Sequence, residues 1–189
     1  KSRITIKIKR DVTNFFNFQP ATRHSYTWRV PVLGYIVLVL CAYLLGSIPT
    51  GYLVARAKGI DIRTVGSGNI GATNAFRVLG TPAGVFVLLV DALKGYAACI
   101  WMTDLLISVF ALHPDNLVTE RAVAGFAAIL GHTFTCWLHF KGGKGIATSA
   151  GVLLGIAPLA MLGGLAAFLL LLFSTRYVSL GSLAAALGV

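Results

Sequence analysis

Charged residues are scarce in this sequence. They make up 12% of its 189 residues, and only six are acidic, whereas 57% of the residues are hydrophobic. The mean hydropathy of +0.81 lies far above that of soluble domains. The composition therefore excludes an ordinary soluble domain and indicates an integral membrane protein that contacts the lipid bilayer.

Cysteine is also scarce and irregularly placed. The three cysteines, at positions 41, 99 and 136, are odd in number and lie in separate apolar segments, which is untypical of a disulfide framework. No Cys/His spacing suits zinc, and no acidic cluster suits a divalent cation. We therefore expect neither a metal nor a cofactor.

The surplus of positive charge does not indicate nucleic-acid binding. The formal net charge is +10, but seven of the sixteen Lys and Arg residues lie within residues 1–29, where only Asp11 opposes them. Elsewhere the sequence has no basic face interleaved with aromatic residues. We interpret residues 1–29 as a basic arm, either disordered or a non-native extension. Residues 30–189 form a transmembrane domain, which we expect to be truncated at its C-terminus because the chain stops inside an apolar run.

Long apolar segments dominate the rest of the chain. Four of them cover residues 30–55, 82–103 (with a possible extension to residue 112), 121–140 and 146–173, and another begins at residue 177. Pro49 and its flanking glycines predict a kink in the first segment, and Pro158 predicts that the fourth divides near Ala157 into two shorter helices. The sequence thus predicts an all-α, polytopic membrane helical bundle with six spans. One long tilted helix over 146–173 remains an alternative, and it would move every later loop across the bilayer.

The distribution of charge between the loops predicts their sidedness. In the six-span layout, the loops at 56–77, 141–145 and 175–176 share one side and hold seven basic residues. The loop on the other side, between the second and third spans, has three acidic residues (Asp104, Asp115 and Glu120) against Arg121 alone. The positive-inside rule places the basic loops in the cytoplasm. The basic arm disagrees, because the same layout puts it outside.

Two glycine-rich polar segments interrupt the hydrocarbon. The first is Gly-Ser-Gly-Asn-Ile-Gly-Ala-Thr-Asn-Ala-Phe-Arg at 66–77, and the second is Phe-Lys-Gly-Gly-Lys-Gly at 140–145. Glycine allows backbone N–H groups to approach an anion, and the cations and amides supply charge and direction. Neither segment has the context of a Rossmann fingerprint or a P-loop. The pattern predicts a phosphate site formed by Ser67, Gly68, Asn69, Gly71, Thr73, Asn74, Arg77, Lys141, Gly142, Gly143 and Lys144.

Several polar residues inside the apolar segments are further candidates. Asp91 and Lys94 are one helical turn apart, so we interpret them as a structural ion pair, with direct substrate contact as the alternative. His132 precedes the second glycine-rich segment and is either a packing or capping residue or a substrate-binding base. Ser179 and Ser182 share a helical face on the same membrane side. No histidine is followed five positions later by aspartate, which disfavours acyltransferases that use a His/Asp pair.

These motifs together resemble one family. The segment at 66–77, Asp-Ala-Leu-Lys-Gly at 91–95, Gly-His-Thr-Phe at 131–134 with the segment at 140–145, and Thr-Arg-Tyr-Val-Ser-Leu-Gly-Ser at 175–182 occur in the order found in the bacterial acyl-phosphate-dependent glycerol-3-phosphate acyltransferases. The resemblance covers residues 33–189. It implies an enzyme of the bacterial inner membrane with seven transmembrane helices in the full fold and a site facing the cytoplasm.

The resemblance also implies a reaction and residue roles. Such an enzyme transfers a fatty acyl group from acyl phosphate to the first hydroxyl of glycerol 3-phosphate, forming lysophosphatidic acid and phosphate in phospholipid biosynthesis. Ser67 and Arg77 match residues that grip phosphate, together with a lysine of the second segment (Lys141 or Lys144) and a serine of the Ser179/Ser182 pair. The oligomeric state is left open.

Three features depart from the family pattern, and one other function fits the composition. The basic arm lies outside the pattern, Thr135 replaces a proline, and by the resemblance we expect the given sequence to end before the family's last helix, which carries a substrate-contacting His and Asn. A membrane transporter for a phosphorylated metabolite is the alternative, because it too would place cations at broken helices. The two halves of the chain show no repeat that would support it.

Overall fold

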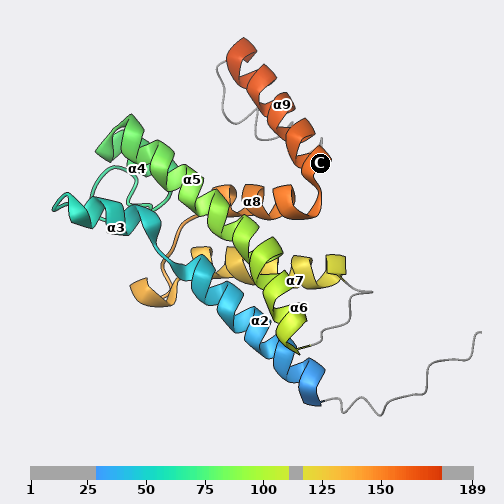
Figure 1. Cartoon of the computed structure of the whole chain (residues 1–189). Helices are drawn as coiled ribbons and strands as arrows, with labels where there is room; N and C mark the ends of the chain where they lie inside the picture. The colour runs from blue at the N-terminus through green and yellow to red at the C-terminus, as the bar shows by residue number, and fades with distance from the viewer. Residues whose placement is uncertain (1–28, 111–116, 176–189) are drawn as a thin grey trace, which may run out of the picture. The chain divides into compact units, whose positions relative to one another are not determined.

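The computed structural model describes residues 29–110 and 117–175, and every regular element within them is a helix (Figure 1). In chain order these are α2 (Arg29–Ser47), α3 (Thr50–Ala57), α4 (Ala72–Leu79), α5 (Thr81–Ala97), the π-helix η1 (Ala98–Met102), α6 (Thr103–Phe110), α7 (Leu117–Thr133), the 3₁₀ helix η3 (Cys136–Leu138), α8 (Ile146–Ile156) and α9 (Pro158–Thr175). The predicted basic arm, the last span, Ser179 and Ser182 lie outside the described residues.

The predicted kink in the first span is a break between α2 and α3. Pro49 has no backbone N–H, and its ring disfavours a helical conformation of the preceding residue, so α2 ends at Ser47. The carbonyl of Ile48, freed by the break, accepts hydrogen bonds from the backbone N–H of Thr50 at 3.0 Å and from Lys94 Nζ at 2.9 Å. A side chain from a distant helix therefore satisfies the polar backbone that the break exposes.

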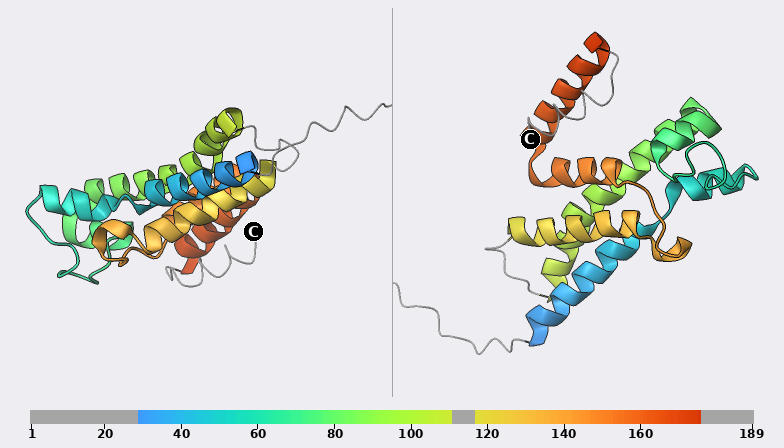
Figure 2. Two further views of the ribbon diagram at one scale, coloured as in Figure 1. Left: turned by 90° about the horizontal axis from the view of Figure 1, so that it is seen from below. Right: turned by 180° about the vertical axis from the view of Figure 1, so that it is seen from behind.

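The second span extends beyond the predicted range 82–103, in the direction of the possible extension to residue 112. α5, η1 and α6 form one continuous helix from Thr81 to Phe110 (Figure 1), which bends toward its α6 end (Figure 2). The hydroxyl of Thr103 donates to the Ala98 carbonyl at 3.1 Å, next to the π-helical turn. Two stretches of the described residues are long and apolar enough to cross a membrane: this helix, and Val32–Ala57, which contains the break at Pro49.

The fourth apolar segment divides as predicted. α8 ends at Ile156 and α9 begins at Pro158, and the two helices diverge at this turn (Figures 1 and 2). The structure thus favours two helices over the single long helix. Exposed apolar side chains cover much of α9, among them Leu159, Leu170 and Phe173, as expected for a surface that faces lipid.

Small residues bring α5, α7 and α8 into close contact. A Cβ added at Gly151 or Gly95 would clash with the backbone of the facing helix, at Ala92 and Thr148 respectively, and one added at Gly125 would clash with Val152. Glycines at such crossings let helix backbones approach closely, which is how membrane helices gain packing energy. This packing holds the helices that surround the site.

Two predicted boundaries are wrong. The polar segment 56–77 was expected to be a loop, but residues 72–79 form α4, which buries Asn74 and Ala75. The third span was expected to reach Phe140, but α7 ends at Thr133. After it, His139 and Phe140 adopt left-handed backbone conformations, with φ of 55° and 60°, and turn the chain. Apolar composition alone does not reveal such a turn.

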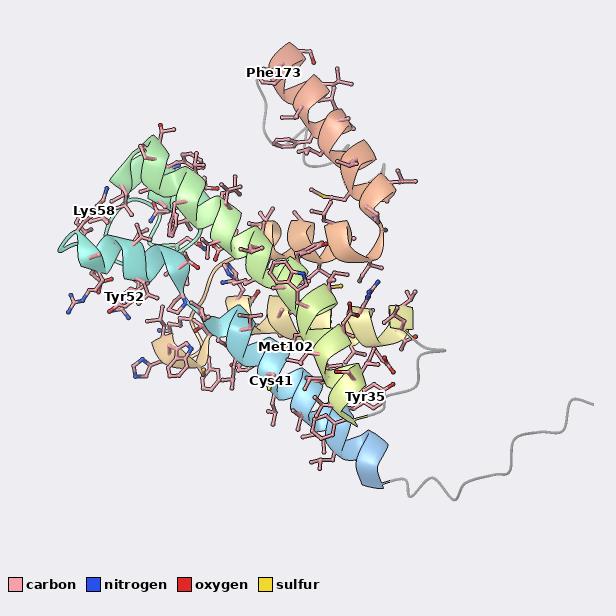
Figure 3. The ribbon with its side chains drawn as sticks, in the orientation of Figure 1. Tyr35, Cys41, Tyr52, Lys58, Met102 and Phe173 are labelled. Carbon is pink, nitrogen blue, oxygen red and sulfur yellow. The ribbon has the colours of Figure 1, made fainter. Side chains whose placement is uncertain are left out.

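The acidic residues assigned to the loop after the second span lie in helices. Asp104 belongs to α6 and pairs with Arg121 of α7 at 3.2 Å. Glu120 is fully buried and accepts a hydrogen bond from the Tyr35 hydroxyl at 3.0 Å. Figure 3 shows Tyr35 at the end of α2 far from α3, where Tyr52 and Lys58 lie. Asp104 and Glu120 therefore connect neighbouring helices. Asp115, the third acidic residue assigned to that loop, lies outside the described residues.

Candidate anion-binding site

Both glycine-rich segments line one cavity. It has a volume of about 310 Å³ and is bordered by Ser67, Asn69, Gly71, Ala72, Thr73, Asn74, Arg77, Leu88, Asp91, His132, Lys144, Gly145, Ile146 and Ala147. Residues from α4, α5, α7 and the start of α8 thus meet at one place. Segments that are about 70 residues apart in the sequence share a single site.

Asn74 braces the first glycine-rich segment. Its Oδ1 accepts a hydrogen bond from the Ser67 N–H at 2.9 Å, and its Nδ2 donates to the carbonyls of Asn69, Val65 and Ile62 at 2.9, 3.1 and 3.3 Å. Gly66 and Gly68 have φ of 62° and 69°, conformations that favour glycine. One buried amide therefore fixes the loop that carries Ser67.

The second glycine-rich segment is held by the end of α7. The N–H groups of Gly142 and Gly143 donate to the carbonyls of Thr133 and His132 at 2.9 and 3.0 Å. A Cβ added at Gly143 would clash with the His132 ring. Gly145 then takes φ of 73° and begins α8, so that the first residues of this helix border the cavity. Unpaired N–H groups at a helix N-terminus attract anions.

Two cations of the glycine-rich segments border the cavity and one does not. Arg77, in the last turn of α4, and Lys144 are exposed and line it, whereas Lys141 is exposed but is not part of its lining. Within residues 29–110 and 117–175, neither Arg77 nor Lys144 makes a side-chain hydrogen bond or ion pair. Both charges are therefore available to an anion in the cavity.

A buried polar cluster lies at the inner side of the same cavity. Asp91 Oδ1 lies 2.9 Å from Lys94 Nζ and accepts a hydrogen bond from the Thr50 hydroxyl at 2.9 Å. His132 Nδ1 lies 3.7 Å from the same oxygen and has no hydrogen-bond partner among the described residues. The structure thus brings the predicted pair Asp91 and Lys94 into contact and adds His132 beside it. Lys94 itself does not line the cavity.

The remaining predicted site residues take varied positions. Ser67 and Thr73 are exposed and line the cavity, as do the partly buried Asn69 and Gly71. Gly68, Gly142 and Gly143 shape the loops but are not part of the lining. Sequence reasoning missed Thr50, whose only signal is its place directly after the Pro49 break. The predicted fourth segment begins at residue 146, where α8 begins, but sequence reasoning missed that Ile146 and Ala147 border the cavity.

One surface ion pair lies on the loop leading to the first glycine-rich segment. Arg63 donates to Asp61 through Nη2 at 2.7 Å and through Nε at 2.9 Å, and these hydrogen bonds lower the pKa of Asp61 to about 2. The Arg63 guanidinium also lies over the Tyr52 ring, 4.9 Å from its centre. In the described part of the chain, no group of three or more His, Cys, Asp or Glu side chains is placed to hold a metal ion.

The fold and the cavity together define a class: a helical membrane protein with a glycine-lined, cationic site for an anionic ligand. Comparisons with known proteins agree. The family model described as glycerol-3-phosphate acyltransferase matches residues 36–189. The chain belongs to this family, so it is a membrane acyltransferase, as the motifs predicted.

Relatives and solved structures support this assignment. The chain is 51% identical over 154 residues to the glycerol-3-phosphate acyltransferase of Geotalea daltonii and 50% identical over 155 residues to that of Geobacter sulfurreducens. Each match covers 82% of this chain and 75% of the relative. It is also similar to the crystal structure of PlsY, an integral membrane glycerol 3-phosphate acyltransferase, in its glycerol 3-phosphate form. That match has a TM-score of 0.68 and 40% identity, and covers 82% of this chain and 73% of that one. The predicted all-α membrane fold is confirmed.

Proposed function

We propose that this protein transfers a fatty acyl group from acyl phosphate to the 1-hydroxyl of glycerol 3-phosphate and releases inorganic phosphate. The observation that carries the proposal is the single cavity lined by both glycine-rich segments, with the cations Arg77 and Lys144 in its lining. Both substrates are phosphate esters or anhydrides, which such a site suits. Solved structures of PlsY in a glycerol 3-phosphate form and a lysophosphatidic acid form support the acceptor and the product.

The reaction needs little covalent assistance from the protein. Acyl phosphate is an activated mixed anhydride, so the hydroxyl oxygen of the acceptor attacks the acyl carbon, and the bond from that carbon to the phosphate oxygen breaks. The proton of the hydroxyl goes to the departing phosphate. The protein has to orient the two substrates, stabilise the charge that develops on the departing phosphate and exclude water. A dedicated general base is then unnecessary.

The geometry supports particular roles for the cavity residues. Arg77 would grip phosphate in a bidentate manner, Lys144 would act as a second point charge, and Ser67 would donate its hydroxyl. Because Lys141 lies outside the lining, we assign the second phosphate contact to Lys144. The glycines Gly68, Gly142 and Gly143 would act indirectly, by placing backbone N–H groups and the two loops.

We further propose that the cavity faces the cytoplasm and that the membrane is the bacterial inner membrane. Both glycine-rich segments border one cavity, so they occupy the same side, and the basic residues around them follow the positive-inside rule. Membrane-impermeant thiol reagents tested on single cysteines introduced near Thr64 and Lys141, in a variant without the native cysteines, would check this. Labelling of intact cells at both positions would contradict the proposal.

Product formation by the purified protein in detergent is the main test. With acyl phosphate and glycerol 3-phosphate, we expect lysophosphatidic acid and phosphate in equal amounts. Absence of product in detergent, combined with glycerol 3-phosphate uptake into sealed proteoliposomes, would instead support a transporter. The same assay with acyl-CoA in place of acyl phosphate tests the donor, and equal rates with both donors would contradict the proposed specificity.

A further inference from the structure

The cavity has two chemically different ends. Its exposed edge carries the cations Arg77 and Lys144, whereas its inner wall carries the carboxylate of Asp91 and the ring of His132, which are 1% and 5% exposed. A phosphate group is attracted to the first end, whereas at the second end Lys94 already pairs with Asp91, and the carboxylate offers a hydrogen-bond acceptor instead of a cation. An acceptor with a phosphate at one end and hydroxyls at the other is therefore oriented by the cavity itself.

Asp91 is prepared to accept one more hydrogen bond. Thr50 and Lys94 both contact Oδ1, and no described residue donates to Oδ2. An ionised carboxylate only accepts hydrogen bonds, so a ligand group beside it must be a donor. The hydroxyl of an alcohol meets this requirement, whereas a ketone or a second phosphate does not. Lys94 balances the charge of the buried carboxylate.

His132 gives an independent indication that a polar ligand group belongs here. It is almost fully buried and borders the cavity, yet no residue within 29–110 or 117–175 forms a hydrogen bond with its Nδ1. A buried polar atom without a partner costs free energy, and native structures rarely keep one without a reason. Because Gly143 packs against the other side of the ring, the imidazole has little freedom to move away.

We infer that Asp91 and His132 form a subsite that binds the hydroxyl at carbon 2 of the acceptor and so selects a glycerol phosphate over acceptors without this hydroxyl. The inference depends on the proposed function, because it states which group of glycerol 3-phosphate binds to the inner wall of the cavity. Binding the non-reacting hydroxyl there fixes carbon 2 and leaves the hydroxyl of carbon 1 free to attack the donor. Asp91 and His132 are thus specificity-determining residues.

The test compares two acceptors that differ by one hydroxyl. Glycerol 3-phosphate and 3-hydroxypropyl phosphate both offer a primary alcohol and a phosphate, and only the first has the hydroxyl at carbon 2. We expect the native protein to prefer glycerol 3-phosphate by about 100-fold in kcat/KM, because loss of the hydroxyl leaves buried polar groups unpaired. In Asp91→Asn this ratio should fall to about 10-fold or less, because the hydroxyl then donates its hydrogen bond to a neutral amide oxygen instead of a charged carboxylate. His132→Gln should lower it as well.

Controls separate specificity from stability and from the proposed function. Both acceptors are measured on one preparation, so the folded fraction cancels from the ratio. Asp104→Asn, the same substitution in an ion pair that does not line the cavity, should keep the native ratio. A native protein that acylates both acceptors equally, or variants at positions 91 and 132 that keep the native ratio, would overturn the inference while leaving the proposed function intact. A native protein that acylates neither would overturn the proposed function itself.

If Asp91→Asn does not fold, a second variant tests the same inference. Thr50→Val deletes one of the two hydrogen bonds that orient the carboxylate and leaves the charge pair with Lys94 in place. It should lower the ratio several-fold. An unchanged ratio in Thr50→Val would count against the subsite.

Discussion

The two glycine-rich segments have similar composition but are held in different ways. The first is braced from within, because Asn74 makes four hydrogen bonds to the backbone of its own and the preceding loop. The second is braced from outside, since the carbonyls of His132 and Thr133 at the end of α7 hold Gly142 and Gly143. Loops of similar composition can therefore lose their conformation through different changes. The first depends on one of its own side chains, and the second depends on a neighbouring helix.

The largest expected effect concerns the cation that each segment brings to the cavity. Arg77→Ala should reduce kcat/KM by about 10³-fold, and Lys144→Ala by about 10²-fold, because each removes a charge that stabilises the departing phosphate. Lys141→Ala is the matched control in the same segment, and its effect should stay within a few-fold since Lys141 does not line the cavity. Steady-state kinetics with both substrates would check this. A Lys141 variant weaker than the Lys144 variant would reverse our assignment of the lysine.

The internal brace of the first segment can be broken by one substitution. Asn74→Ala removes four hydrogen bonds around a buried amide and should lower the free energy of unfolding by about 2–4 kcal/mol. Asn69→Ala, which removes a single hydrogen bond to the Gly71 N–H, should cost about 1 kcal/mol. Denaturant unfolding in detergent measures both. Equal losses would show that Asn74 does not hold the loop.

The external brace of the second segment should respond to added volume. In Gly143→Ala the new methyl group clashes with the His132 ring, so either the ring or the loop must shift. We expect the KM for glycerol 3-phosphate to rise about tenfold, with a smaller change in kcat. Gly163→Ala in α9 is the control, because a Cβ there meets no atom of the described residues within 4 Å, and it should leave KM unchanged. Unchanged KM in both variants would mean that the His132 packing does not position the acceptor.

The sequence could predict the chemistry of the site better than its boundaries. Glycines, amides and cations close together in the sequence indicate a phosphate site, and Pro49 and Pro158 predict helix breaks. Both predictions depend on the chemistry of the residues themselves. The early end of α7 is instead followed by a turn in which His139 and Phe140 have left-handed backbone conformations and the N–H groups of Gly142 and Gly143 bond back to α7 carbonyls. Local pattern does not encode such contacts.

The same distinction applies to polar residues in the apolar helices. The spacing of Asp91 and Lys94 predicts their pairing, since both lie one turn apart on one helix. Their contacts with Thr50 and the Ile48 carbonyl come from the break between α2 and α3, 41 and 46 residues away in the sequence, and no spacing rule reveals them. Glu120 likewise reads as a loop charge in the sequence, and only tertiary packing buries it against Tyr35.

The smallest expected effect is a pH dependence at the loop before the first segment. The Arg63 hydrogen bonds lower the pKa of Asp61 from 3.8 to about 2, so the folded state favours the ionised carboxylate. A depressed pKa adds stability above the unfolded-state value, and this contribution disappears as the pH falls from about 4 to about 2. The pair is exposed, so the effect on the melting temperature in detergent should be small and should weaken with salt. Asp61→Asn and Arg63→Gln should each remove the same part of the acid dependence and leave the unfolding profile at pH 6–8 unchanged in shape. An acid dependence that persists in both variants would assign it to other groups.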